Sequence, residues 1–181
     1  MKSTLILCVR RVLVGLAKVV LLPTVLALGV VPASAVAATA APPTIKILVL
    51  DAATAGLLST PVFTWRIDGG AVQFEATASR DLSNPVDVYF GVVAPGERVF
   101  SWSPAVGAPN LREGLFPAGQ AITATQISST GLLGSGPQYT FPAGSPLGIY
   151  SVFFLLVYAG NDPRDPRQWV AANMSPLVIT N

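Results

Sequence analysis

The 181-residue sequence contains no histidine and only one cysteine, and just 11% of its residues are charged. Without histidine the chain lacks the commonest general base and the commonest zinc ligand. The single thiol, Cys8, lies too close to the N-terminus to belong to a folded domain, and it has no partner for an internal disulfide. These absences exclude a Ser/His/Asp triad, a Cys/His dyad, a zinc finger and a disulfide framework.

Positive charge is concentrated at the N-terminus. Four of the 11 basic residues lie within the first 18 positions, whereas the first acidic residue is Asp51. The remainder of the chain therefore has seven basic residues against nine acidic ones, a net charge of −2. Such a balance lacks the basic surface that nucleic-acid-binding proteins present to phosphates. We expect no nucleic-acid partner.

The N-terminus also has the three parts of an export signal. A basic start is followed by an apolar run over residues 19–31, and then by the small residues Ala33, Ser34 and Ala35. This order of segments is typical of proteins that leave the cytoplasm. We expect an extracellular or periplasmic location, reached by either the general or the twin-arginine route.

Removal of this segment is expected after Ala35, with alternative cleavage points up to Ala40. The signal peptide then covers residues 1–35, and residues 36–43 form a linker. An uncleaved leader would instead act as a membrane anchor, because the uncharged run continues to Ile45. Membrane contact is expected only through such an uncleaved leader.

Apolar and β-branched runs separated by Gly and Pro predict a succession of short strands. The expected strands span residues 44–51, 62–67, 71–77, 86–93, 98–102, 121–128, 138–141, 149–159 and 174–180. Two hairpins are expected, with turns at residues 68–70 and 95–96. The run at 149–159 is the most apolar, which predicts a central strand covered on both faces. No segment beyond the leader has a helical period.

Alternation within the first of these hairpins predicts its buried face. Phe63 and Trp65 share one side of the first arm, and Val72 and Phe74 share one side of the second. Glu75 alternates with the second pair and is expected to face solvent. The apolar sides should therefore lie against a core.

About seven to nine strands with turns between them predict an all-β fold, an antiparallel β-sandwich of the immunoglobulin type over residues 44–181. Tyr150 follows a turn at Gly148 and opens the most apolar strand. That is the position of a tyrosine corner, in which the hydroxyl donates to backbone upstream. A tyrosine that simply packs against the sheet is the alternative.

Four short motifs follow one another in the sequence: D-x-Y at Asp87, a loose P-x-G at residues 92–96, G-x-Y at Gly148 and G-x-D-P-x-D-x-x-x-W at Gly160. Together they resemble an immunoglobulin-like domain that recurs in secreted bacterial proteins and has no known function. The resemblance covers most of residues 71–179. It implies a module without catalytic residues, usually within a larger exported protein, whereas this sequence contains little besides the domain.

Three aromatic residues are candidates for ligand binding: Trp102, Tyr89 and Trp169. A flat apolar ring face suits a pyranose sugar, although aromatics at alternate strand positions more often fill the core. Trp102 is the best candidate, because serines flank it near a turn. An exposed Trp102 would favour carbohydrate binding, and a buried one would favour a structural role.

Asn161, Asp162 and Asp165 offer oxygen atoms that calcium prefers as ligands. Turn formation explains them better, because Asp-Pro pairs start turns, arginines lie beside the acids and no EF-hand glutamate follows. We therefore predict no metal site. Asp87 is expected to accept hydrogen bonds from a neighbouring loop or to pair with an arginine such as Arg98.

Nothing in the sequence identifies a cleft or a pair of acids for catalysis, so we expect no enzyme and no cofactor. The predicted function is that of an exported structural or protein-interaction module. Its partner is an unknown protein or cell-surface component. A carbohydrate-binding module with a polysaccharide ligand is the alternative.

Overall fold

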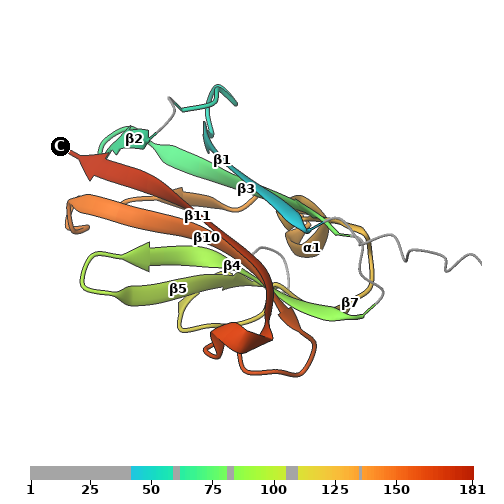
Figure 1. Cartoon of the computed structure of the whole chain (residues 1–181). Helices are drawn as coiled ribbons and strands as arrows, with labels where there is room; N and C mark the ends of the chain where they lie inside the picture. The colour runs from blue at the N-terminus through green and yellow to red at the C-terminus, as the bar shows by residue number, and fades with distance from the viewer. Residues whose placement is uncertain (1–41, 59–61, 81–83, 105–109, 135) are drawn as a thin grey trace, which may run out of the picture. The chain divides into compact units, whose positions relative to one another are not determined.

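The computed structural model describes residues 42–58, 62–80, 84–104, 110–134 and 136–181. The expected signal peptide and nearly all of the expected linker lie outside these residues. Within the described part, a four-stranded and a seven-stranded β-sheet pack together with almost no helix (Figure 1). The mostly-β, sandwich-like architecture predicted from the sequence is therefore confirmed.

The four-stranded sheet is centred on β3 (Ala71–Ser79). On one side β1 (Thr44–Asp51) pairs antiparallel with it along the full length of β1. On the other side β8 (Gln126–Ser128) and β9 (Gln138–Thr140) pair with opposite ends of β3. The two short strands together form one edge of this sheet.

A five-residue helix, α1 (Ser129–Leu133), separates β8 from β9. The Ser128 side chain caps its first turn, and Gly134 ends it in the left-handed conformation with a φ of 79°. The Ser129 hydroxyl accepts from the Ala76 backbone N–H at 2.9 Å, so this donor of β3 is satisfied where neither short strand pairs with it. The sequence did not predict this helix, because one turn is too short to show a period.

The seven-stranded sheet has the order β2-β11-β10-β4-β5-β6, with β7 also paired to β4. Its strands are β2 (Phe63–Arg66), β4 (Val86–Ala94), β5 (Arg98–Ser103), β6 (Asn110–Glu113), β7 (Gly119–Ile122), β10 (Gly148–Tyr158) and β11 (Trp169–Thr180). β10 lies between β11 and β4 and is buried continuously over residues 152–157. Its central position agrees with its apolar sequence. The predicted hairpin of β4 and β5 is also present.

The other predicted hairpin, over residues 62–77, is wrong. The chain does turn at residues 68–70, but β2 joins the seven-stranded sheet and β3 the four-stranded one. β2 pairs with β11 in parallel, with Phe63 opposite Leu177, so the sheets are not purely antiparallel. Because both arms have one apolar side, placing them in opposite sheets turns both sides toward the same core.

The predicted number of strands is also too low. The described residues contain eleven strands, against the expected seven to nine. The stretch over residues 121–128 was expected to be one strand, but it divides into β7 and β8, which belong to different sheets. β6 was not predicted, because its sequence is short and polar. Short edge strands of this kind depend on a neighbour for their conformation.

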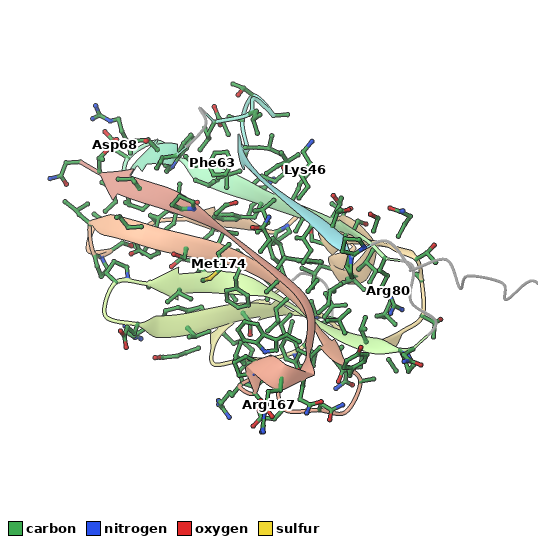
Figure 2. The ribbon with its side chains drawn as sticks, in the orientation of Figure 1. Lys46, Phe63, Asp68, Arg80, Arg167 and Met174 are labelled. Atoms are coloured by element: carbon green, nitrogen blue, oxygen red, sulfur yellow. The ribbon has the colours of Figure 1, made fainter. Side chains whose placement is uncertain are left out.

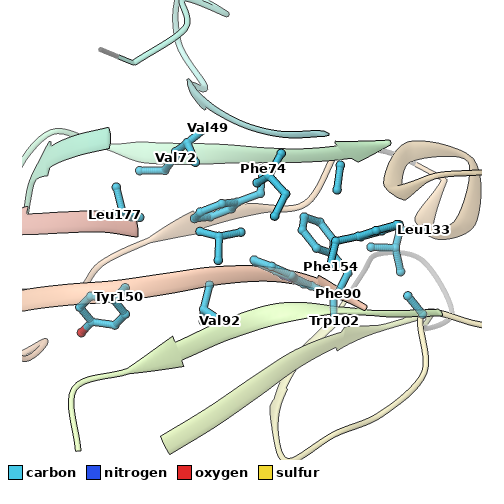
Figure 3. Close-up of a cluster of buried hydrophobic side chains, with 14 of the residues drawn as sticks. Val49, Val72, Phe74, Phe90, Val92, Trp102, Leu133, Tyr150, Phe154 and Leu177 are labelled. Carbon is cyan, nitrogen blue, oxygen red and sulfur yellow. The ribbon is translucent and has the colours of Figure 1, made fainter. Parts of the chain in front are cut away.

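The core lies between the two sheets and is rich in aromatic rings (Figure 3). The ring centroid of Trp102 is 5.0 Å from that of Phe74 and 4.9 Å from that of Phe90. Phe90 and Phe154 pack edge to face with centroids 5.5 Å apart. Phe74 comes from the four-stranded sheet and the other three from the seven-stranded sheet, so this group joins the layers.

Candidate functional site

The three aromatic candidates for a sugar-binding surface do not share one face: Trp102 lies in the core between the sheets, whereas Tyr89 and Trp169 lie on the outer face of the seven-stranded sheet. Trp102 is 1% exposed and packs in the core between Phe74 and Phe90. Tyr89 is 5% exposed and belongs to a separate buried cluster, whereas Trp169 is 40% exposed. The serines that flank Trp102 belong to the opposite face of β5 by strand alternation. Because its ring is buried, Trp102 is not available to stack on a sugar.

The acidic loop before β11 forms turns with its own arginines. The Asp165 carboxylate accepts from the Arg167 side chain, with Nε–Oδ1 and Nη2–Oδ2 distances of 2.9 Å, and this hydrogen bonding lowers the pKa of Asp165. Asp162 accepts from the Arg164 backbone N–H at 2.9 Å, and Asn161 directs its amide N–H groups to backbone carbonyls. Within the described ranges, no three His, Cys, Asp or Glu side chains are grouped to hold a metal. These contacts favour turn formation over calcium binding.

Asp87 is buried on β4 and binds the backbone of two other segments. Its Oδ1 accepts from the Ala121 N–H and its Oδ2 from the Gly160 N–H, both at 2.9 Å. Arg98, the alternative partner considered for Asp87, pairs with Glu113 at 2.9 Å. The Asp87 carboxylate thus connects β7 and the turn after β10 to the centre of the sheet.

Tyr150 and Gly148 shape the entry into β10. The Tyr150 hydroxyl donates to the Pro146 carbonyl at 2.9 Å, four residues upstream. Its ring packs edge to face on Phe141 with centroids 5.2 Å apart, and burial raises the pKa of the hydroxyl. Gly148 has a φ of 126°, which a residue with a side chain rarely adopts.

The outer face of the seven-stranded sheet, which points away from the other sheet, is also apolar. Phe153, Leu155 and Val157 of β10 form a second buried cluster there with Tyr89. Burial raises the pKa of the Tyr89 hydroxyl, and the nearby charge of Asp87 acts in the same direction. An antiparallel sheet in a two-layer fold commonly has a solvated outer face. An apolar outer face therefore needs additional cover.

Part of that cover is the connection from β6 to β7. Leu115 packs against the outer cluster, and the buried Ser101 hydroxyl fixes the segment on both sides. It donates to the Gly114 carbonyl at 2.8 Å and accepts from the Phe116 N–H at 2.7 Å. The serine beside Trp102 therefore holds a covering segment in place.

The cover is incomplete, and an apolar groove of about 150 Å³ remains on this outer face. We call it the outer groove. Residues that line it include Val93, Val99, Leu115, Phe153, Trp169 and Met174, and none of its lining residues is charged. Trp169 is held by a 2.8 Å hydrogen bond from its Nε1 to the Pro163 carbonyl, yet is 40% exposed. Met174 is 56% exposed on β11 (Figure 2).

Arg80 is a structural residue that the sequence did not reveal. It is only 4% exposed and donates to three backbone carbonyls, those of Asn84, Ile122 and Ala124, at 2.6 to 3.0 Å. Burial lowers the pKa of its guanidinium. Because its partners are backbone atoms, no residue type elsewhere in the sequence could have predicted this role. It fixes the end of β3 to the end of β7, to the segment that follows β7 and to the segment that precedes β4.

Comparison with known proteins identifies no relative of this chain: no protein-family model and no curated protein matches it. The resemblance to a secreted immunoglobulin-like domain therefore stays a prediction from the sequence. In the residues that the structure describes, no helix is long and apolar enough to span a membrane.

Proposed function

We propose that this protein is an exported, immunoglobulin-like β-sandwich that acts as a non-catalytic protein-interaction module. The proposal of a protein interaction rests on the outer groove, where Trp169 and Met174 are exposed at an apolar surface without charged residues. We infer that it receives a protein segment with large apolar side chains and without charge.

Strand order supports the immunoglobulin-like part of the proposal. In that fold, strands A, B and E share one sheet, and strands C, F and G share the other. Along this chain β1, β3 and the β8–β9 edge share one sheet, and β4, β10 and β11 share the other. The Tyr150 hydroxyl bond to Pro146 corresponds to the tyrosine corner at the start of strand F.

Export is supported by the N-terminal sequence. The basic start, the apolar run over residues 19–31 and the small residues up to Ala35 have the order of a signal peptide. The one cysteine, Cys8, lies within this N-terminal segment, so the remainder of the chain has no thiol that could be oxidised outside the cytoplasm. The proposed place of action is the cell surface or the periplasm.

The chemistry of the outer groove supports a protein partner. Exposed apolar patches on soluble domains mark interaction sites, and Trp and Met are enriched in the centres of protein interfaces. A charged group placed in this groove would lose its hydration, and no lining residue carries a charge to compensate it. The carbohydrate alternative is not proposed further, since Trp102 is buried.

Site-specific photocrosslinking in the producing cells tests this proposal. A photoreactive phenylalanine replaces Met174 in the outer groove or Thr77, which is exposed on the four-stranded sheet. We expect a crosslinked partner from position 174 and none from position 77. Equal crosslinking at both positions would indicate a different surface, and no crosslink at position 174 would contradict the proposal.

The identified partner is then titrated against two charge variants by calorimetry. Met174→Glu should weaken binding by at least about tenfold, because it places an unpaired charge at the groove. Thr77→Glu adds the same charge elsewhere and should leave the affinity unchanged. Unaltered affinity in Met174→Glu would exclude the outer groove as the binding surface.

A further inference from the structure

A second cavity lies on the other face of the seven-stranded sheet, between the two sheets. Its volume is about 160 Å³, and we call it the interior pocket. Six aromatic side chains line it: Phe74, Phe100, Trp102, Tyr139, Phe141 and Tyr150. Because they come from both sheets, the pocket is a gap in the packing of the core and is separate from the outer groove.

The floor of the interior pocket is formed by buried aromatic side chains. Phe74 and Trp102, which reach it from opposite sheets, are each 1% exposed (Figure 3). The pocket opens beside the turn after β4, where Pro95, Arg98 and Ser145 contribute to its lining. A molecule that reaches Phe74 and Trp102 would therefore bury its inner side against apolar rings, while its outer side faces the opening.

The aromatic side chains that form the walls of the interior pocket pack against one another. The ring of Phe141 packs edge to face on both Tyr139 and Tyr150, with centroid distances of 5.0 and 5.2 Å. Tyr150 is itself held by the hydrogen bond to Pro146 at 2.9 Å. A wall of mutually oriented rings resists collapse, so the space remains available to a ligand.

The only charged side chain among the lining residues is already neutralised. The Arg98 guanidinium makes two hydrogen bonds to the Glu113 carboxylate, at 3.0 and 2.9 Å, and lies 5.1 Å from the centre of the Phe100 ring. An anionic ligand would have to compete with Glu113 for this group. The electrostatics therefore favour an uncharged ligand.

The size of the interior pocket indicates one ring. An engineered cavity of about 150 Å³ lined by aliphatic and aromatic side chains binds benzene in another protein. We propose that the interior pocket binds a small, uncharged apolar molecule of about one six-membered ring. This binding activity goes beyond the proposed protein interaction and uses the opposite face of the sheet.

Toluene is the probe for the test, added to ¹⁵N-labelled protein that is produced from the full-length coding sequence. Amide chemical shifts should change saturably in residues 138–150, whose lining residues face only the interior pocket, with a dissociation constant of roughly 0.1–1 mM for so few heavy atoms. Residues 163–174, whose lining residues face only the outer groove, serve as the internal reference. Absence of saturable shifts, or shifts centred on the outer groove, would overturn the proposal.

Two leucine variants separate pocket filling from a general effect. Ala94→Leu adds bulk within the interior pocket, and Ala172→Leu makes the same change at the outer groove. We expect Ala94→Leu to weaken toluene binding at least tenfold and Ala172→Leu to leave it unchanged. Equal affinity in both variants would overturn the proposal, and the wild-type shift map decides the matter if either variant fails to fold. Neither result depends on the protein partner of the outer groove.

Discussion

The two faces of the seven-stranded sheet are both apolar, yet they are covered differently. The inner face packs against a complete second sheet, and Phe154 is fully buried there. The outer face is covered in part by the connection from β6 to β7, and Phe153, which precedes Phe154 in β10, is 6% exposed there. A strand as apolar as β10 needs cover on both sides. Where that cover is only partial, an exposed apolar groove results.

Each face also contains a cavity, and the walls of the two cavities differ. The interior pocket is bounded by aromatic rings from two sheets, whereas the outer groove is bounded by the strands on one side and by the segment at Leu115 on the other. That segment depends on hydrogen bonds of the Ser101 hydroxyl. We therefore expect a rigid interior pocket and a more adaptable outer groove.

The largest expected effect comes from truncating one aromatic on each face. Phe154→Ala should lower the free energy of unfolding by about 3–5 kcal/mol, because it leaves a cavity in the main core. Phe153→Ala should cost less, about 1–3 kcal/mol, because its cluster is smaller and less completely covered. Urea unfolding monitored by tryptophan fluorescence measures both. Equal losses would show that the two faces are packed equally well.

The second prediction concerns Asp87, which holds β7 and the turn after β10 to β4. Asp87→Ala removes the acceptor for two backbone N–H groups and should cost about 2–4 kcal/mol. Amide hydrogen exchange should accelerate first in residues 119–122 and 160–168, ahead of β3. Glu113→Gln, at an exposed ion pair, is the control and should leave the unfolding midpoint unchanged. Uniform acceleration throughout both sheets would contradict a local fastening role.

The smallest expected effect is a pH dependence of stability that involves one tyrosine on each face of the sheet. Burial raises the pKa of Tyr150 on the inner side and of Tyr89 on the outer side above the ordinary value of about 10. The folded state then holds these protons more tightly than the unfolded state. Their contribution is fully present below pH of about 10 and is lost as pH rises through the folded pKa.

The variant Tyr150→Phe tests the inner half of this expectation. At pH 8 it should lose about 0.5–1.5 kcal/mol, the value of the hydroxyl bond to Pro146. Above pH 10 its stability should decline less steeply than that of the wild type, and Tyr89→Phe should act likewise on the outer side. Unfolding followed across pH 8 to 11.5 measures both slopes. Unchanged slopes in both variants would show that neither tyrosine is protected by the fold.

The contrast between β10 and the pair β2–β3 shows which structural features the local sequence predicts and which it does not. A long apolar run without charge has only one favourable environment, so residues 149–159 predicted a central strand and the structure has one at Gly148–Tyr158. The hairpin predicted at residues 68–70 required knowledge of the partner strands. A turn brings two strands close, but it does not determine whether they pair or diverge into different sheets.

The residues of the candidate site also differ in how well their roles could be predicted from the sequence. Tyr150 and Asp87 were singled out from the sequence as structural residues, and each makes specific hydrogen bonds to backbone. The residues next to Trp102 and Trp169 in the sequence did not show which of the two tryptophans is exposed. The exposure of a side chain on a strand depends on what packs against that face of the sheet. Arg80 could not be found at all, since its partners are carbonyls brought together by the fold.

The sequence by itself therefore determined the all-β class, the position of the most buried strand and the turns between strands, because apolar alternation and Gly or Pro act locally. Only the tertiary structure decided which sheet each strand joins, which tryptophan is exposed and where the two cavities lie. Those properties depend on surfaces far apart in the chain that compete for the same apolar contacts.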